Sequence, residues 1–128
     1  MIAELLKKEV IDDLTGNILP YWIDRMHDRR GGFYGRRDGS DRLDDDAPKG
    51  AILNGRLLWT FSAAYRTTGR KEYLQAADRV LDYIMSHFID REYGGVYWSL
   101  TADGMPLDTK KQFYAIGFVI YGLSEYVR

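Results

Sequence analysis

The sequence predicts an all-α fold in which helical hairpins form a two-layer α/α toroid. Three observations lead to this expectation: four long helical segments, an alternation between two kinds of helix, and an internal repeat. A helix that is apolar on one side lies at a surface, whereas a helix that is apolar all round is buried on every side. The order along the chain is outer helix, inner helix, outer helix, inner helix, which is typical of such a toroid.

The first and third helices are predicted to be the outer ones. Over residues 2–26 and again over residues 70–88, apolar side chains recur at three- and four-residue spacing, and charged side chains fill the opposite side. Pro20 falls within the first of these helices. Because proline lacks a backbone N–H and its ring clashes with the carbonyl four residues earlier, we expect a kink or break there.

The second and fourth helices are predicted to be the inner ones. The second covers about residues 49–65, contains the apolar stretch AILNGRLLWTF and ends near Gly69. The fourth covers about residues 109–128 and contains the uncharged stretch FYAIGFVIYGL. Thr109 and Gln112 have the spacing of a capping box, which predicts that the fourth helix starts at Thr109.

An internal repeat accompanies this alternation. The segments 30–34 (RGGFY) and 93–97 (YGGVY) align, with their first glycines 63 residues apart (94 − 31). Each copy follows an outer helix, precedes an inner helix and is predicted to be a short hairpin or tight loop. The sequence Ala-Asp-Gly at residues 102–104 supplies a turn after the second copy. Repeats of this kind bury their apolar faces by stacking on neighbouring units.

Two helical hairpins cannot close a ring. The last predicted helix also runs to Arg128 without a terminating Gly, Asn or Pro. We therefore expect residues 1–128 to be the N-terminal part of a single toroid domain whose remainder is absent. The alternative is a four-helix bundle that is complete as it stands. If the first reading holds, the inner helices expose apolar faces, and the isolated chain is expected to self-associate.

Composition excludes several classes of function. The 128 residues carry 18 Lys and Arg against 19 Asp and Glu, so no basic excess favours a nucleic-acid partner. The chain has no cysteine, which excludes disulfides, thiolate zinc sites and a cysteine nucleophile. No apolar run is long enough to span a membrane, and the N-terminus does not have the pattern of a signal peptide. The expected location is therefore the cytoplasm.

Arg56 is the most informative residue of the inner helices. On a helix with about 100° per residue, Trp59 and Thr60 lie within about 60° of it, on an otherwise apolar face. An unpaired buried guanidinium costs several kcal/mol, so Arg56 needs a partner or a wet cavity. It is either held by a carboxylate or carbonyls in the interior, or it offers its N–H groups to the oxygens of a ligand.

The aromatic residues of the fourth helix can also be interpreted in two ways. Tyr114, Phe118 and Tyr121 share one helix face, either as core packing or as rings and hydroxyls that hold a sugar. Gly117 and Gly122 indicate a close approach of helices or room for a ligand. The remaining polar candidates are His27, His87 and the aspartates at 44–46. They are interpreted as structural or solvent-exposed, and no metal site is expected among them.

Six short motifs occur in the order of a known family. They are residues 18–22 (ILPYW), 31–35 (GGFYG), 49–54 (KGAILN), 56–59 (RLLW), 93–98 (YGGVYW) and 111–114 (KQFY). In this order they resemble the N-terminal third of the N-acylglucosamine 2-epimerase family, and most closely its cellobiose and mannobiose 2-epimerase branch. The resemblance implies a toroid of six helical hairpins and a mono- or disaccharide substrate. It also implies a reaction without a metal or redox cofactor.

The reaction that the resemblance implies inverts C2 of a reducing-end sugar. The ring opens, a base removes the proton at C2, and the enediolate is reprotonated on the opposite face. Histidines act as the acid and base in this family, but no residue of this chain matches them, so the chain alone is expected to be inactive. By the same resemblance, Arg56 contacts the reducing-end oxygens and the enediolate, Tyr114 hydrogen-bonds the sugar, and Trp59 and Asn54 are weaker candidates for contact.

Some positions depart from the family pattern, which leaves the substrate open. Gly55 stands where Ser is expected, Gln112 where His is common, and the pair Ile116-Gly117 where Gln-Ala is usual.

Two other functions remain possible on the same fold. A glycoside hydrolase or lyase would need two carboxylates in the pocket, and Glu125 is the one inner-helix acid to consider. A non-catalytic scaffold would bind partners through the exposed inner face.

Overall fold

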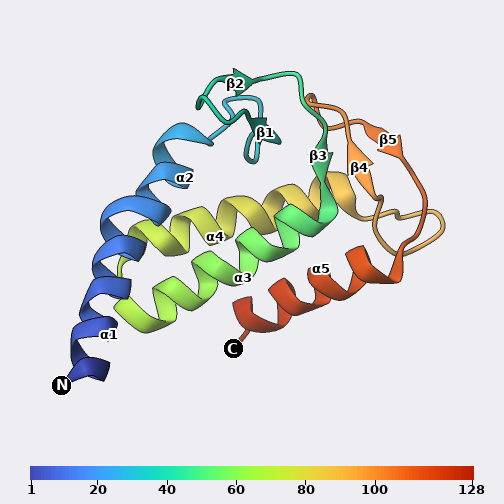
Figure 1. Ribbon diagram of the computed structural model, residues 1–128. Coiled ribbons are helices and arrows are strands. Elements are labelled where there is room, and N and C mark those ends of the chain that lie inside the picture. Colours follow the sequence, from blue (N-terminus) through green and yellow to red (C-terminus); the bar gives the residue numbers. More distant parts are fainter.

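The computed structural model describes residues 1–128 and consists mainly of long helices (Figure 1). The N-terminal helix comprises α1 (Ile2–Asp13), the π-helical segment η1 (Leu14–Ile18) and α2 (Leu19–Arg25). The helix does not break at Pro20, and the irregularity that the structure shows is the π-helical segment just before it. The backbone N–H of Leu19 bonds the carbonyl of Leu14, and Pro20 then stands at the start of α2, where its missing N–H is tolerated.

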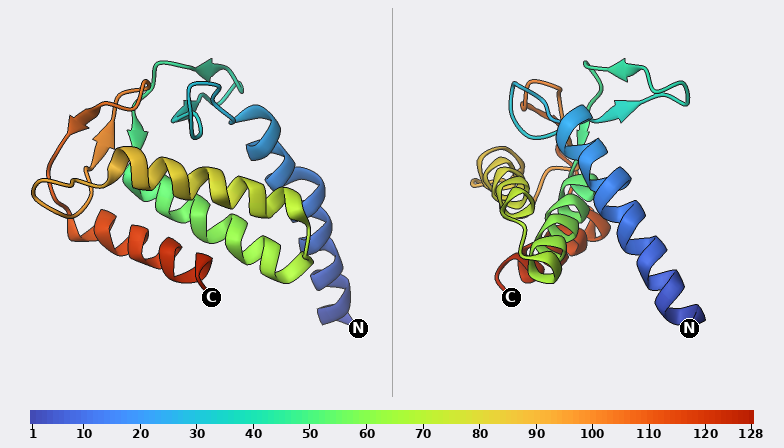
Figure 2. Two further views of the ribbon diagram at one scale, coloured as in Figure 1. Left: turned by 180° about the vertical axis from the view of Figure 1, so that it is seen from behind. Right: turned by 90° about the vertical axis from the view of Figure 1, so that its left-hand side faces the viewer.

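The predicted alternation of outer and inner helices is confirmed. The inner helices α3 (Ala51–Thr68) and α5 (Phe113–Tyr126) lie side by side and run in the same direction (Figures 1 and 2). The outer helix α4 (Lys71–Tyr83), extended by the π-helical segment η2 (Ile84–Phe88), returns along α3. As predicted, α3 ends at a glycine: Gly69 takes the left-handed conformation, with φ of 70°, and closes the helix.

Both inner helices begin later than predicted. Residues 49–50 form a strand, and α3 starts at Ala51. The capping-box prediction is wrong, because α5 starts at Phe113 and Gln112 is its N-cap without a side-chain bond. The segment before α5 is held by other contacts: the N–H of Lys110 bonds the Asp108 carboxylate, and the ammonium of Lys111 binds Asp90.

Short strands connect the loops of the two repeats. β1 (Arg36–Arg37) pairs with β2 (Leu43–Asp44), and a three-stranded antiparallel sheet has the order β3 (Lys49–Gly50), β4 (Ser99–Leu100), β5 (Pro106–Asp108). The predicted turn at residues 102–104 joins β4 to β5. Because β3 immediately precedes α3 and pairs with β4 from the second repeat, the sheet ties the start of one inner helix to the loop that leads to the other.

The core lies between α3 and α4, beneath the two loops. Leu58 and Phe61 of α3 pack with Val80 of α4 and Phe88 of η2, and all four are fully buried. In contrast, α1 has no buried residue, and α5 buries only one of its sides. No helix of the structure is both long enough and apolar enough to cross a membrane.

Glycines let α3 and α5 approach each other backbone to backbone. A Cβ atom added at Gly55 would lie 2.5 Å from the carbonyl oxygen of Phe118, and one added at Gly122 would overlap the carbonyl oxygen of Gly55. A Cβ at Gly117 would meet nothing within 4 Å. Close helix approach, one of the two predicted uses of these glycines, therefore holds for Gly122, whereas Gly117 faces open space.

This difference gives a stability prediction. Gly122→Ala should separate the two helices and destabilise the full-length protein by about 1–3 kcal/mol, because the packed backbone has nowhere to move. Gly117→Ala is the matched control and should stabilise it by about 0.5–1 kcal/mol, since alanine is the better helix former in open space. Urea unfolding followed by circular dichroism measures both changes. A Gly122→Ala midpoint at or above that of the wild type would contradict the close approach.

Candidate functional site

A hollow of about 770 Å³ lies between the two inner helices. From α3 it is lined by Arg56, Trp59 and Thr60, and from α5 by Phe113, Tyr114, Gly117, Phe118 and Tyr121. The structure therefore brings Arg56 and Tyr114, which are far apart in the sequence, to one surface. Their meeting follows from the parallel, side-by-side course of α3 and α5 (Figure 2).

The side chain of Arg56 makes no ion pair and no hydrogen bond to any other residue of the chain. Its guanidinium carbon lies 5.8 Å from the centroid of the Phe118 ring, and the residue is exposed. The interior ion pair and the carbonyl clamp, two of the readings that the sequence allowed, are therefore wrong for this chain. The planar N–H donors of Arg56 remain available to ligand oxygens in the hollow.

Aromatic rings form most of the remaining wall. Trp59 and Tyr121 stack in parallel across the two helices, with centroids 5.1 Å apart and ring planes 3° from parallel. Phe118 stands edge-on to Tyr114 at 5.1 Å. Tyr114 itself is 66 % exposed, so it is not packed into a core in this chain. Apolar ring faces beside a few polar groups are typical of a pocket for a small organic ligand.

Asn54 lies apart from these residues. It is buried, its amide group donates to the carbonyl of Gly50 at 2.8 Å, and it does not line the hollow. Its side-chain oxygen is buried without a hydrogen-bond partner in the chain. The predicted contact of Asn54 with a sugar therefore stays a prediction, whereas Trp59 does line the hollow.

The other titratable candidates lie outside the hollow. Glu125 is buried in an ion pair with Arg66, with its Oε1 atom 2.5 Å from Nη2, and the lining residues of the hollow include no carboxylate. His87 faces the carbonyl of Gly104 through Nδ1 at 3.2 Å. Burial lowers the pKa of His27, and the nearby Arg79 guanidinium adds to this effect. No group of three metal-binding side chains is present in the chain.

Comparison with known proteins identifies the family. The sequence model for N-acylglucosamine 2-epimerase (GlcNAc 2-epimerase) matches residues 32–128. The chain belongs to the N-acylglucosamine 2-epimerase family. It is 60 % identical to the cellobiose 2-epimerase of Bacteroides fragilis over 126 residues, which are 98 % of this chain and 32 % of that protein.

Solved structures agree with this membership. The cellobiose 2-epimerase of Bacillus thermoamylovorans B4167 superimposes with a TM-score of 0.94 at 38 % identity, covering 98 % of this chain and 32 % of that one. A D-mannose isomerase superimposes with a TM-score of 0.76 at 25 % identity, covering 85 % of this chain and 27 % of that one. The fold prediction is confirmed as part of an α/α toroid, and the chain spans about a third of the length of these relatives.

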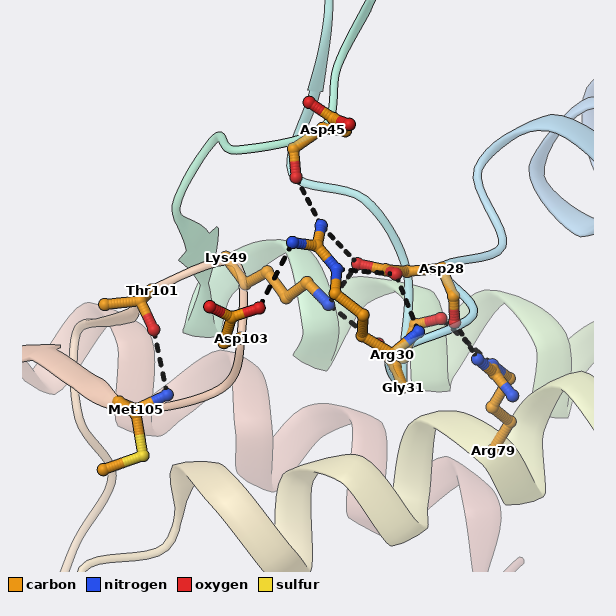
Figure 3. Close-up of polar contacts among 10 residues, drawn as sticks. Asp28, Arg30, Gly31, Asp45, Lys49, Arg79, Thr101, Asp103 and Met105 are labelled. Carbon is orange, nitrogen blue, oxygen red and sulfur yellow. Dashed lines mark hydrogen bonds and ion pairs between the residues drawn. The ribbon is translucent and has the colours of Figure 1, made fainter.

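A buried ion-pair cluster next to the start of α3 was not foreseen from the sequence (Figure 3). The Lys49 ammonium lies 2.8 Å from Oδ2 of Asp28 and 2.7 Å from the carbonyl oxygen of Gly31, and both charged side chains are 1 % exposed. Arg30 also binds the Asp28 carboxylate. In this member of the 2-epimerase family, the cluster ties the first repeat loop to Lys49, which lies two residues before the start of α3.

The cluster shifts the pKa values of its members. Burial by itself would raise the pKa of Asp28, but hydrogen bonds from Arg30 and Lys49 outweigh it and hold that pKa below its ordinary value. Burial lowers the pKa of Lys49 despite the neighbouring carboxylate. A carboxyl group with a lowered pKa in the folded state stabilises the fold above its ordinary pKa, and this stabilisation is lost as the pH falls through the lowered value.

A stability prediction follows for Lys49→Met. The variant removes the buried one of the two cations that pair with the Asp28 carboxylate, leaving Arg30, and should cost up to about 3–5 kcal/mol at pH 7. Because the pKa of Asp28 then rises, the further loss between pH 7 and pH 3 should be smaller than in the wild type. The control is Lys110→Met, which removes a half-exposed pair with Asp108 and should change stability by less than about 1 kcal/mol.

Urea unfolding of the full-length protein at both pH values measures these changes. Equal losses for Lys49→Met and Lys110→Met would contradict the importance assigned to the buried pair.

Proposed function

We propose that this chain is the N-terminal part of a sugar 2-epimerase that inverts C2 of a glucose- or mannose-type reducing end. The observation that carries the proposal is the position of Arg56 and Tyr114 at one aromatic-lined hollow. The sequence relationship to a cellobiose 2-epimerase over nearly the whole chain supports it independently.

The chemistry asks for a cationic donor at the reacting carbons. When a base removes the proton from C2 of the open-chain aldose, negative charge develops on the oxygen at C1 and gives an enediolate. A fixed guanidinium stabilises such an oxyanion more strongly than it stabilises the neutral sugar, which lowers the barrier. We assign this role to Arg56, because its N–H donors have no partner in the chain. Proton return to the opposite face of C2 completes the inversion.

The remaining lining residues are assigned to binding. The exposed phenol of Tyr114 hydrogen-bonds sugar hydroxyls, and the stacked rings of Trp59 and Tyr121 offer an apolar face to the sugar ring. The acid and base are histidines outside residues 1–128 in this proposal, so the chain alone is inactive. The predicted contact of Asn54 is carried forward as the weakest of these assignments.

Residues 1–128 are proposed to form two helical hairpins of a single toroid domain. Exposed apolar side chains on both flanks of the structure support this, including Leu5 of α1 and Ile120 of α5. In a closed ring these flanks would be covered by further hairpins. Self-association of the isolated chain stays a prediction.

The reaction can be tested on the full-length protein in deuterated water. Cellobiose is the first substrate to use, because the relative with 60 % identity is named a cellobiose 2-epimerase. Proton NMR should show deuterium at C2 of the reducing-end residue and the appearance of the C2 epimer. A ketose as the main product would indicate an isomerase like the mannose-isomerase neighbour instead. Absence of deuterium from C2 of cellobiose, glucose and mannose would refute the proposed reaction.

Substitution of Arg56 tests the role of the fork-shaped donor. Arg56→Lys keeps a positive charge but loses the paired N–H groups, and should lower kcat on the order of 100-fold. Arg66→Lys on the same helix is the matched control, because lysine can still pair with Glu125 away from the hollow. It should retain nearly the wild-type kcat. Similar rates for Arg56→Lys and the wild type would remove Arg56 from the reaction.

A further inference from the structure

The buried ion pair before α3 has a counterpart before α5. Lys49 binds Oδ2 of Asp28 at 2.8 Å, and Lys111 binds Oδ2 of Asp90 at 2.6 Å. Both the aspartates and the lysines are 62 residues apart (90 − 28 and 111 − 49). Each aspartate begins the loop that follows an outer helix, and each lysine lies just before an inner helix.

The two pairs are built alike. Oδ1 of Asp28 accepts the backbone N–H of Arg30, and Oδ1 of Asp90 accepts the backbone N–H groups of Glu92 and Tyr93. The backbone of the repeat loop therefore binds one oxygen of each carboxylate and the lysine binds the other, which at Asp28 is shared with the Arg30 guanidinium. Hydrogen bonds from Lys111 and from the loop backbone hold the pKa of Asp90 below its ordinary value, so the carboxylate is charged at neutral pH.

Few polar contacts hold the start of α5: beside the ion pair with Asp90, the ammonium groups of Lys110 and Lys111 lie over the rings of Trp98 and Tyr97, at 4.7 and 4.9 Å. Residues 109–114 are all exposed, and the N-cap Gln112 makes no side-chain bond to the helix. Apart from contacts with the adjacent Asp108, the bond from Lys111 to Asp90 is the only ion pair or hydrogen bond from a side chain of this segment to another part of the chain. The stem of Lys111 also packs against the backbone of Gly95, which leaves room for it.

Tyr114 is the second residue of α5, and its hydroxyl group has no hydrogen-bond partner in the chain. Its ring contacts Phe118 within the same helix. The position of the phenol at the hollow therefore depends on where the helix begins and how its first turn is oriented. The contact between Lys111 and Asp90 is the side-chain ion pair that lies nearest to this first turn, while Ala115 and Val119 pack the buried side of the helix.

We propose that Lys111 is a positioning residue, which through Asp90 fixes the first turn of α5 and so holds Tyr114 at the sugar. The inference rests on the proposed function, because it assigns the effect to sugar binding. Lys111 is suited to a test, since its side chain is 32 % exposed, whereas Lys49 is fully buried and its loss damages the fold.

The first experiment compares Lys111→Met with Lys110→Met in the full-length protein. Lys111→Met keeps the aliphatic stem but removes the ammonium, and should raise KM for cellobiose about tenfold with little change in kcat, as expected when an interaction equally strong in the ground and transition states is lost. Lys110→Met removes the neighbouring lysine and should leave both constants unchanged. Asp90→Asn keeps an oxygen for the loop N–H groups and removes the charge, so it should reproduce the effect of Lys111→Met.

A double-mutant cycle with Tyr114→Phe separates positioning from general stability. If Lys111 acts through Tyr114, the double variant Lys111→Met/Tyr114→Phe has the same KM as Tyr114→Phe alone. Independent effects that multiply, or an unchanged KM in both Lys111→Met and Asp90→Asn, would overturn the inference.

Amide hydrogen exchange provides a readout that does not need epimerase activity. Exchange over residues 113–118 should be faster in Lys111→Met than in Lys110→Met or the wild type, while α3 is unaffected. If the wild-type full-length protein does not epimerise the sugar, the proposed function is refuted, but the effect of Lys111 on α5 is not. Unchanged exchange in α5 would refute the positioning role, whatever the reaction proves to be.

Discussion

The close packing of α3 against α5 is the constraint on which the candidate site depends. Gly55 and Gly122 let the two backbones meet without intervening side chains, and this places the Arg56 face of one helix beside the Tyr114 face of the other. Neither helix could form the hollow alone. Just before their first turns, the same two helices are tied to the repeat loops by aspartate–lysine pairs, so packing sets their separation and the ion pairs hold the segments that lead into them.

Much of the fold could be predicted from hydrophobic patterning, because the inner helices are apolar nearly all round and the outer helices are apolar on one side only. The end of α3 at Gly69 was equally readable, since a left-handed residue after a helix favours glycine. The late starts of α3 and α5 could not be predicted from the sequence, because the strand pairing of residues 49–50 and the Lys111 contact depend on loops that are distant in the sequence. A local signal such as the capping-box spacing at Gln112 was overridden by these tertiary contacts.

The candidate site was predicted in part. Helix periodicity and the family resemblance singled out Arg56, Trp59 and Tyr114, and all three line the hollow. Asn54 does not line the hollow, because its amide group donates to the carbonyl of Gly50, and its contact with a sugar stays a prediction. The aspartate–lysine pairs were missed, although aligning the repeats on their aspartates rather than their glycines brings both lysines into register. Charge complementarity within a repeat was the signal that could have found them.

The most direct test of the account is a crystal structure of the full-length protein with cellobiose bound. The account predicts the reducing-end residue in the hollow between α3 and α5. The Arg56 guanidinium should lie about 2.7–3.2 Å from an oxygen on C1 or C2, and the Tyr114 hydroxyl should bond the same sugar. A disaccharide bound elsewhere, or an Arg56 guanidinium held by a protein carboxylate away from the sugar, would contradict it.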